Sequence, residues 1–394
     1  MKSEDNHSLR HLFTWSLLAL IAGSLWNLSR YIPSAALAGL LVLPVAALSQ
    51  DNAWKRLAVG MAYYLPATAS IVPSYGAFFH SHHFGLPGIA VWLAASFLLA
   101  APWALARGPW STLVAAVLSG ILGPLSIWPV AGLLFPGMGL VGLIGMVILL
   151  YAAGEVAASE RGLLKSYAKV ADASFWVLVG SIVLSNVFHF AANTPEPPAS
   201  WIAVDTVGLK QTGGDVFASL ETAQQVIRAG RSVSEARVLV FPEAVLNDML
   251  PGTVGLVSSA VPKGQTWLVG AEDGVHDGVW AFTRGKPPVI VAASTIPMPL
   301  SMWRPWSARS YKPTWVKQTF ELAGQKVWSA VCYEQVVPWT WVEALWQSPS
   351  LILLQSNAWW ASPGNPAPFI QSTQASGWLR LLGIPYLVAR NTAL

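Results

Sequence analysis

The feature that most constrains this chain is a series of apolar runs that fills its first half, up to Phe190. Each run is about 20 residues long, the length that a helix needs to cross the hydrocarbon core of a bilayer. Over the whole sequence 54% of the residues are hydrophobic and 11% are charged, against about 25% charged residues in ordinary soluble domains. The first half therefore predicts a polytopic α-helical membrane domain.

We predict about seven membrane spans in this half. They fall at residues 11–28, 32–49, 57–78, 88–106, 110–134, 137–153 and 173–192. The residues before the first span carry charges of both signs, and no small-residue cleavage site follows it. We therefore expect a retained first span and not a signal peptide.

Lysine and arginine in the short loops indicate the orientation of the spans, because positively charged loops stay in the cytoplasm. With the N-terminus inside, the opposite side holds Arg30, and the cytoplasmic segments hold Lys2, Arg10, Lys55, Arg56, Arg107, Arg161, Lys165 and Lys169. An odd number of spans then carries the rest of the chain outside. We predict a multi-pass protein of the bacterial inner membrane with a periplasmic C-terminal domain.

The second half has charged residues at normal density and reads as one α/β domain. Prolines at 195, 197 and 198 favour a stiff linker over residues 193–198, which separates a membrane domain at 1–192 from a domain at 199–394. Strand-like and helix-like patterns alternate there, among them an amphipathic helix at 215–229 and an apolar strand at 326–331, as in layered α/β folds. Basic residues are dispersed among acids, so the composition does not predict nucleic-acid binding.

Polar residues follow three of the predicted strands, at the place where layered α/β folds gather reactive groups. Glu243 ends the run VFPE at 240–243, and Cys332 and Glu334 lie in AVCYE at 330–334. The third strand runs into SNAWW at 356–360. Cys332 is the one cysteine of the sequence, which excludes an internal disulfide and a zinc site built from several cysteines. We predict no metal and no cofactor.

At these motifs the chain resembles the nitrilase superfamily, whose fold is an α-β-β-α sandwich and whose site is a Glu, Lys and Cys triad. The run ARNTA at 389–393 resembles a late strand of that family. With membrane spans ahead of it, the domain most closely resembles apolipoprotein N-acyltransferase, and PLSMWRPW at 299–306 resembles that family's segment between lysine and cysteine. Plasmid conjugal-transfer proteins of the TraB type resemble shortened relatives. The resemblance implies that this chain is either a similarly shortened relative or a sequence that is incomplete at its C-terminus.

The resemblance implies Cys332 as nucleophile, Glu243 as general base and Glu334 as a supporting residue. The lysine departs from the family pattern, since aligning the prolines of VIVAASTIPMPLSMW at 289–303 puts Ala292 or Ser294 at its position. Lys286 is the candidate that remains, provided that a strand register shift brings it to the site. One missing oxyanion-stabilising group commonly costs about 10²–10³ in rate.

Two functions stay open at this point. The first is an acyltransferase or hydrolase that forms a thioester on Cys332, with a phospholipid as acyl donor and a lipoprotein or other amine as acceptor, both implied by the resemblance. The second is a catalytically degenerate relative that serves as an envelope component in plasmid conjugation. The lysine gap favours the second, and the intact Glu243 and Cys332 favour the first.

Overall fold

The computed structural model describes residues 2–79, 85–121, 123–160, 168–191, 195–209, 213–308 and 310–393. The chain forms two compact units: unit 1 holds residues 1–193, 336–339 and 364–383, and unit 2 holds residues 194–335, 340–363 and 384–394. The segment 364–383 therefore groups with the helical first half, although it follows strands of the second half in sequence. Arg161, Lys165 and the first two residues of the predicted linker lie outside the described residues.

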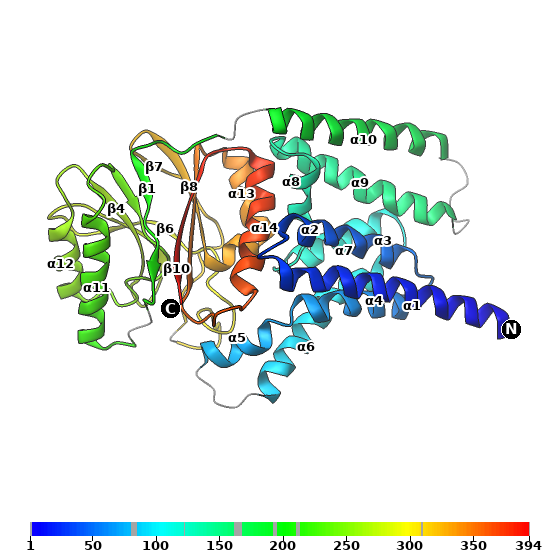
Figure 1. The fold of residues 1–394 in the computed structure, drawn as a ribbon, viewed down its shortest axis with the longest axis horizontal. Coiled ribbons are helices and arrows are strands. Elements are labelled where there is room, and N and C mark those ends of the chain that lie inside the picture. Colours follow the sequence, from blue (N-terminus) through cyan, green and yellow to red (C-terminus); the bar gives the residue numbers. More distant parts are fainter. Residues whose placement is uncertain are drawn as a thin grey trace. The chain divides into compact units, whose positions relative to one another are not determined.

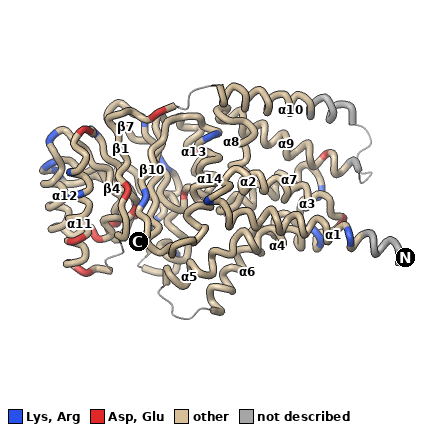
Figure 2. The backbone as a smooth tube through the Cα atoms, in the orientation of Figure 1, with Lys and Arg blue, Asp and Glu red and all other residues tan. Residues whose placement is uncertain are grey.

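Unit 1 is built from helices (Figure 1). Its α-helices are α1 (Lys2–Ser24), α2 (Pro33–Ala38), α3 (Val42–Leu48), α4 (Ala53–Ala67), α5 (Ile71–Phe78), α6 (Leu86–Ala100), α7 (Pro109–Ile121), α8 (Ala131–Leu134), α9 (Gly139–Glu160), α10 (Ala168–Ala191) and α14 (Ala367–Leu382). Charged residues are sparse along these helices, as Figure 2 shows. This distribution suits association with a membrane.

The described residues do not support the expectation of seven spans. Among the described residues, three helices are long and apolar enough to cross a membrane, at Ser8–Leu28, Leu86–Leu105 and Gly139–Ala158. Three further apolar helices are shorter, at Pro33–Leu48, Pro109–Ile121 and Trp176–Ala191. The apolar composition was read correctly, but several runs do not form one continuous helix.

Proline and glycine explain where two of the predicted spans break. The run 57–78 is divided between α4 and α5, since α4 ends one residue after Pro66 and α5 begins with Pro73 in its first turn, where proline is tolerated. The run 110–134 stops being helical at Ile121. Gly123 then adopts a φ of 100°, a backbone conformation that no right-handed helix contains.

Within unit 1, α14 is held by close and specific contacts. Gly132 of α8 lies so near α14 that an added Cβ would meet the carbonyl oxygen of Gly377 at 1.8 Å. The side chain of Gln374 accepts a hydrogen bond from the backbone N–H of Leu125 at 2.9 Å. These contacts require small residues and a matched polar pair, so they fix the position of α14 among the helices of unit 1.

Unit 2 contains two five-stranded sheets, with strand orders β1-β3-β4-β5-β6 and β2-β10-β9-β8-β7. The strands are β1 (Trp201–Ala203), β2 (Thr206–Val207), β3 (Val238–Val240), β4 (Thr266–Glu272), β5 (Asp277–Phe282), β6 (Val289–Ala293), β7 (Phe320–Leu322), β8 (Gln325–Val331), β9 (Leu351–Ala358) and β10 (Tyr386–Thr392). Neighbouring strands are parallel within the group β1, β3 and β4 of the first sheet and within the group β8, β9 and β10 of the second. The predicted α/β class is confirmed.

The two sheets pack face to face through an apolar core. One cluster joins Val240 and Leu268 of the first sheet to Val327, Leu353 and other residues of the second. A second cluster covers the outer face of the first sheet with α11 (Val216–Arg231) and α12 (Pro251–Ala260). On the second sheet, Trp328 contacts Trp341 of α13 (Pro338–Gln347), with ring centroids 5.2 Å apart. The order of layers is that of an α-β-β-α sandwich.

Candidate active site

The ends of the parallel strands bring the predicted site residues together. Glu243 follows β3, Cys332 follows β8, and Asn357 lies near the end of β9. Cys332 adopts a φ of 42° and Ala244, the neighbour of Glu243, a φ of 46°. Non-glycine residues rarely adopt this left-handed conformation, which costs of order 1–3 kcal/mol and concentrates at functional sites. The strained backbone thus lies at Cys332 itself and directly after Glu243.

Glu243 and Cys332 lie close enough to shift each other's pKa. Burial, followed by the charge of Glu272, raises the pKa of Glu243 to about 8, although the interaction with Cys332 opposes the shift. Burial and the neighbouring Glu243 raise the pKa of the Cys332 thiol well above its usual value. The resting pair is therefore a thiol beside a carboxyl that can change its protonation near neutral pH, as a general base requires.

Asn357 and Asn391 hold Glu243 in place. The backbone N–H of Asn357 donates to Glu243 Oε2 at 3.0 Å, and the Asn357 side chain donates to the backbone carbonyl of Glu243 at 3.1 Å. Asn391 of β10 in turn donates to Asn357 Oδ1 at 2.7 Å and to the carbonyl of Leu209 at 2.6 Å. This chain of contacts links three of the sequence motifs, those at 240–243, 356–360 and 389–393, to the thiol.

A buried lysine that the sequence did not indicate lies beside Glu334, two residues after Cys332. Lys317 is 2% exposed and forms an ion pair with Glu334, which is fully buried. The Lys317 ammonium also donates to the carbonyl of Ser329 at 2.9 Å. Glu334 Oε2 accepts a further hydrogen bond from the backbone N–H of Val331 at 2.7 Å, so the cation lies next to the peptide that precedes the nucleophile.

Lys286 is not gathered into this cluster. It is exposed in the turn between β5 and β6, whereas the opposite end of that strand pair, at Gly278 and Ala293, leads to the site. Ser294, which with Ala292 was one of two residues expected at the position of the family lysine, is buried with its hydroxyl 3.5 Å from Glu334 Oε1. Ser294 and Lys317 thus share one carboxyl, and Lys317 brings the positive charge from a later segment.

Two more buried carboxyls stand near the pair, and sequence patterns gave no signal for them. Glu272 ends β4 and Asp277 begins β5, directly opposite each other in the sheet. Burial raises the pKa of Glu272 to about 7 and, helped by the charge of Glu243, raises that of Asp277 well above its usual value. The Tyr311 hydroxyl donates to Glu272 Oε2 at 2.6 Å. The surroundings of Cys332 are therefore rich in buried acids whose pKa values are raised.

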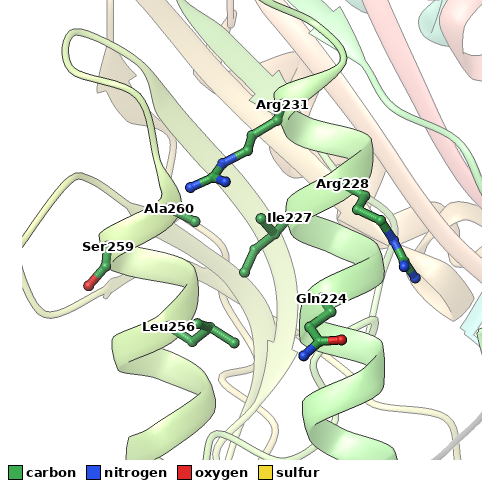
Figure 3. A pocket seen from close by; sticks show the side chains of 7 residues that line it. All are labelled: Gln224, Ile227, Arg228, Arg231, Leu256, Ser259 and Ala260. Atoms are coloured by element: carbon green, nitrogen blue, oxygen red, sulfur yellow. The ribbon is translucent and has the colours of Figure 1, made fainter.

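A surface pocket of unit 2 lies apart from these residues. Its volume is about 350 Å³, and it is formed between α11 and α12. Ile227 and Arg231 of α11 face Leu256 and Ala260 of α12 across it (Figure 3). None of the residues that line it belongs to the group around Cys332.

The sequence is similar to two curated proteins over most of its length. It is 29% identical over 376 residues to "Conjugal transfer protein TraB" of Agrobacterium fabrum, covering 85% of this chain and 83% of that protein. The chain resembles conjugal transfer proteins of the TraB type. A "Probable conjugal transfer protein TraB" of Sinorhizobium fredii is 26% identical over 384 residues, covering 89% of this chain and 93% of its own length. The likeness to TraB proteins thus extends across both the helical and the α/β parts.

Two other comparisons add little to this likeness to TraB. No family model matches the chain. Among solved structures, the chain is similar to a mutant of the amidase from Nesterenkonia sp. AN1 that carries acrylamide at its active-site cysteine, with 13% identity and a TM-score of 0.33, over 48% of this chain and 78% of the amidase. A likeness this weak supports no statement about activity, which has to be argued from the residues themselves.

Proposed function

We propose that this chain is a membrane-associated acyltransferase or hydrolase that works through a thioester on Cys332. The observation that carries the proposal is the position of Glu243, a buried carboxyl that follows β3, is held by the backbone N–H of Asn357 and lies close to the thiol of Cys332 at the end of β8. Burial raises the pKa of this carboxyl to about 8, and a proton acceptor close to neutral pH is what deprotonation of a thiol during attack requires.

The reaction proceeds in two half-reactions at one sulfur. Ionised Glu243 takes the thiol proton as Cys332 Sγ attacks an acyl carbonyl, and it returns that proton to the leaving alcohol or amine as the thioester forms. A second nucleophile, an amine or water, then attacks the thioester. Glu243 accepts the proton of that nucleophile and passes it to the departing sulfur, which restores the thiol.

Lys317 supports this proposal because it brings a positive charge to Glu334, whereas neither Ala292 nor Ser294, the residues expected at the position of the family lysine, carries one. The ammonium is buried next to the Val331 peptide, and charge near a developing oxyanion acts strongly where water is excluded. Its partner Glu334 holds the lysine in position.

We further propose that the reaction serves conjugal transfer, the process in the names of the TraB relatives, at the bacterial inner membrane. The acyl donor is a phospholipid and the acceptor an amine, such as that of a lipoprotein. Basic residues at positions 2, 10 and 107 favour a cytoplasmic N-terminus, and an odd number of crossings then makes unit 2 periplasmic. Accessibility of an engineered cysteine in unit 2 to a membrane-impermeant reagent tests this orientation.

The enzyme proposal is tested by incubating the full chain in phospholipid vesicles and measuring the mass of the peptide that contains Cys332. We expect an acyl adduct that is absent from Cys332→Ala and formed about 10²–10⁴ times more slowly by Glu243→Gln. Glu221→Gln, which changes an exposed carboxyl of α11, is the matched control. If no adduct forms and Cys332→Ala supports normal conjugation frequency, the chain acts as a non-catalytic envelope component.

A further inference from the structure

The segment between β6 and β7 exposes an unusual number of large apolar side chains. We call residues 296–316 the aromatic loop. Its exposed members are Met298 at 42%, Leu300 at 54%, Trp306 at 71%, Trp315 at 51% and Val316 at 55%. On the surfaces of soluble proteins such residues occur singly, and several of them in one segment indicate a contact surface.

The charges of the aromatic loop are all of one sign. The sequence contains no aspartate or glutamate between Asp277 and Glu321, whereas the loop itself carries Arg304, Arg309 and Lys312. Tryptophan is enriched at the boundary between lipid and water, and basic residues beside it are attracted to anionic headgroups. A surface that binds a protein partner would carry acids as well as bases, whereas this loop carries bases alone. The combination therefore fits the surface of an anionic bilayer better.

The aromatic loop is tied to the candidate active site at several points. The Tyr311 hydroxyl donates to Glu272 at 2.6 Å, and the backbone N–H of Trp315 donates to the carbonyl of Thr295 at 3.2 Å. Directly after the loop, Lys317 pairs with Glu334. Whatever binds the exposed side of the loop is therefore connected through two or three residues to the carboxyls around Cys332.

We infer that the aromatic loop docks on a bilayer that contains anionic phospholipid. Such a surface is available to this chain, because three helices among the described residues are long and apolar enough to cross a membrane. Arg304 and Lys312 meet the headgroups while Trp306 and Leu300 enter the interface. That the docked loop presents a lipid ester to Cys332 rests on the proposed function; the docking itself does not.

The test places an environment-sensitive fluorophore on the loop of the full chain. Cys332→Ser removes the native thiol, and Trp306→Cys then gives one labelling position. The matched control is Phe217→Cys in α11, which replaces another exposed aromatic residue, 84% exposed, outside the loop. Both proteins are reconstituted in nanodiscs of phosphatidylcholine, with or without phosphatidylglycerol, and with nitroxide-labelled lipid as quencher.

We expect the probe at position 306 to emit further to the blue and to be quenched several-fold more than the probe at position 217 in nanodiscs that contain phosphatidylglycerol. Quenching should weaken in phosphatidylcholine alone. Equal quenching at the two positions would overturn the docking, and equal quenching of position 306 in the two lipids would overturn its assignment to an anionic surface. Since both proteins lack Cys332, failure of the enzyme proposal cannot produce either result.

Discussion

The ion pair of Lys317 and Glu334 predicts a large loss of stability when one partner alone is removed. Lys317 is 2% exposed and Glu334 is fully buried, so water cannot replace either partner. In Lys317→Met, the Glu334 carboxylate keeps its hydrogen bond from the Val331 N–H but has no cation. Breaking a buried pair in this way costs about 3–5 kcal/mol. We expect the free energy of unfolding of unit 2 to fall by that amount.

A double-mutant cycle measures this loss in the full chain in detergent, with pulse proteolysis in urea as the assay. Lys317→Met combined with Glu334→Gln leaves no unpaired charge, so most of the lost stability should return. Lys286→Met is the matched control, because Lys286 is exposed and surface substitutions usually change stability by less than about 0.5 kcal/mol. If Lys317→Met and Lys286→Met unfold at the same urea concentration, the buried pair does not stabilise the protein and the reasoning fails.

Three further predictions concern the thiol and the helices. Removing the charge of Glu243 by Glu243→Gln should lower the pKa of Cys332, so alkylation by iodoacetamide should reach its half-maximal rate at a lower pH than in the wild type; an unchanged profile would contradict the pairing. Folding raises the pKa of Glu243 from 4.5 to about 8, so the stability that protonated Glu243 contributes is complete below pH 4.5 and is lost as pH rises through 8. Between these pH values the urea midpoint of Glu243→Gln should therefore fall less than that of the wild type. Parallel curves of urea midpoint against pH for the two proteins would refute the assignment. Gly132→Ala should destabilise unit 1 by several kcal/mol, since its Cβ would meet Gly377 O at 1.8 Å, whereas Gly180→Ala, with open space around it, should melt at or slightly above the wild-type temperature.

The fold could be predicted from the sequence wherever hydrophobic residues recur with the period of one kind of secondary structure. Apolar strands such as 326–331 and the amphipathic helix at 215–229 were placed close to their observed bounds. The three-residue strand β7 was missed because its segment is too short to show alternation. The number of spans was overestimated because run length measures apolar composition, whereas Pro66, Pro73 and Gly123 decide whether the helix continues.

The candidate site was predictable only in the part that follows strand ends. Glu243 and Cys332 each come directly after an apolar strand, and parallel strands bring such ends to one edge. Lys317 was missed because it comes from a loop, outside the proline-containing segment in which the family lysine was sought. Only the fold brings it to Glu334. Its one signal in the sequence was its setting in a long stretch without acids, which gives no indication of a buried partner.

The passage of the chain through unit 1 between β9 and β10 limits how this protein can be cut for study. A recombinant fragment that starts at Thr194 would retain α14 but lose the helices that hold it, including Gly132 and the Leu125 N–H that donates to Gln374. An apolar helix would then be left without its neighbours between the strands that carry Asn357 and Asn391. The α/β half is thus not a separable module, and soluble-domain expression should yield aggregation-prone material.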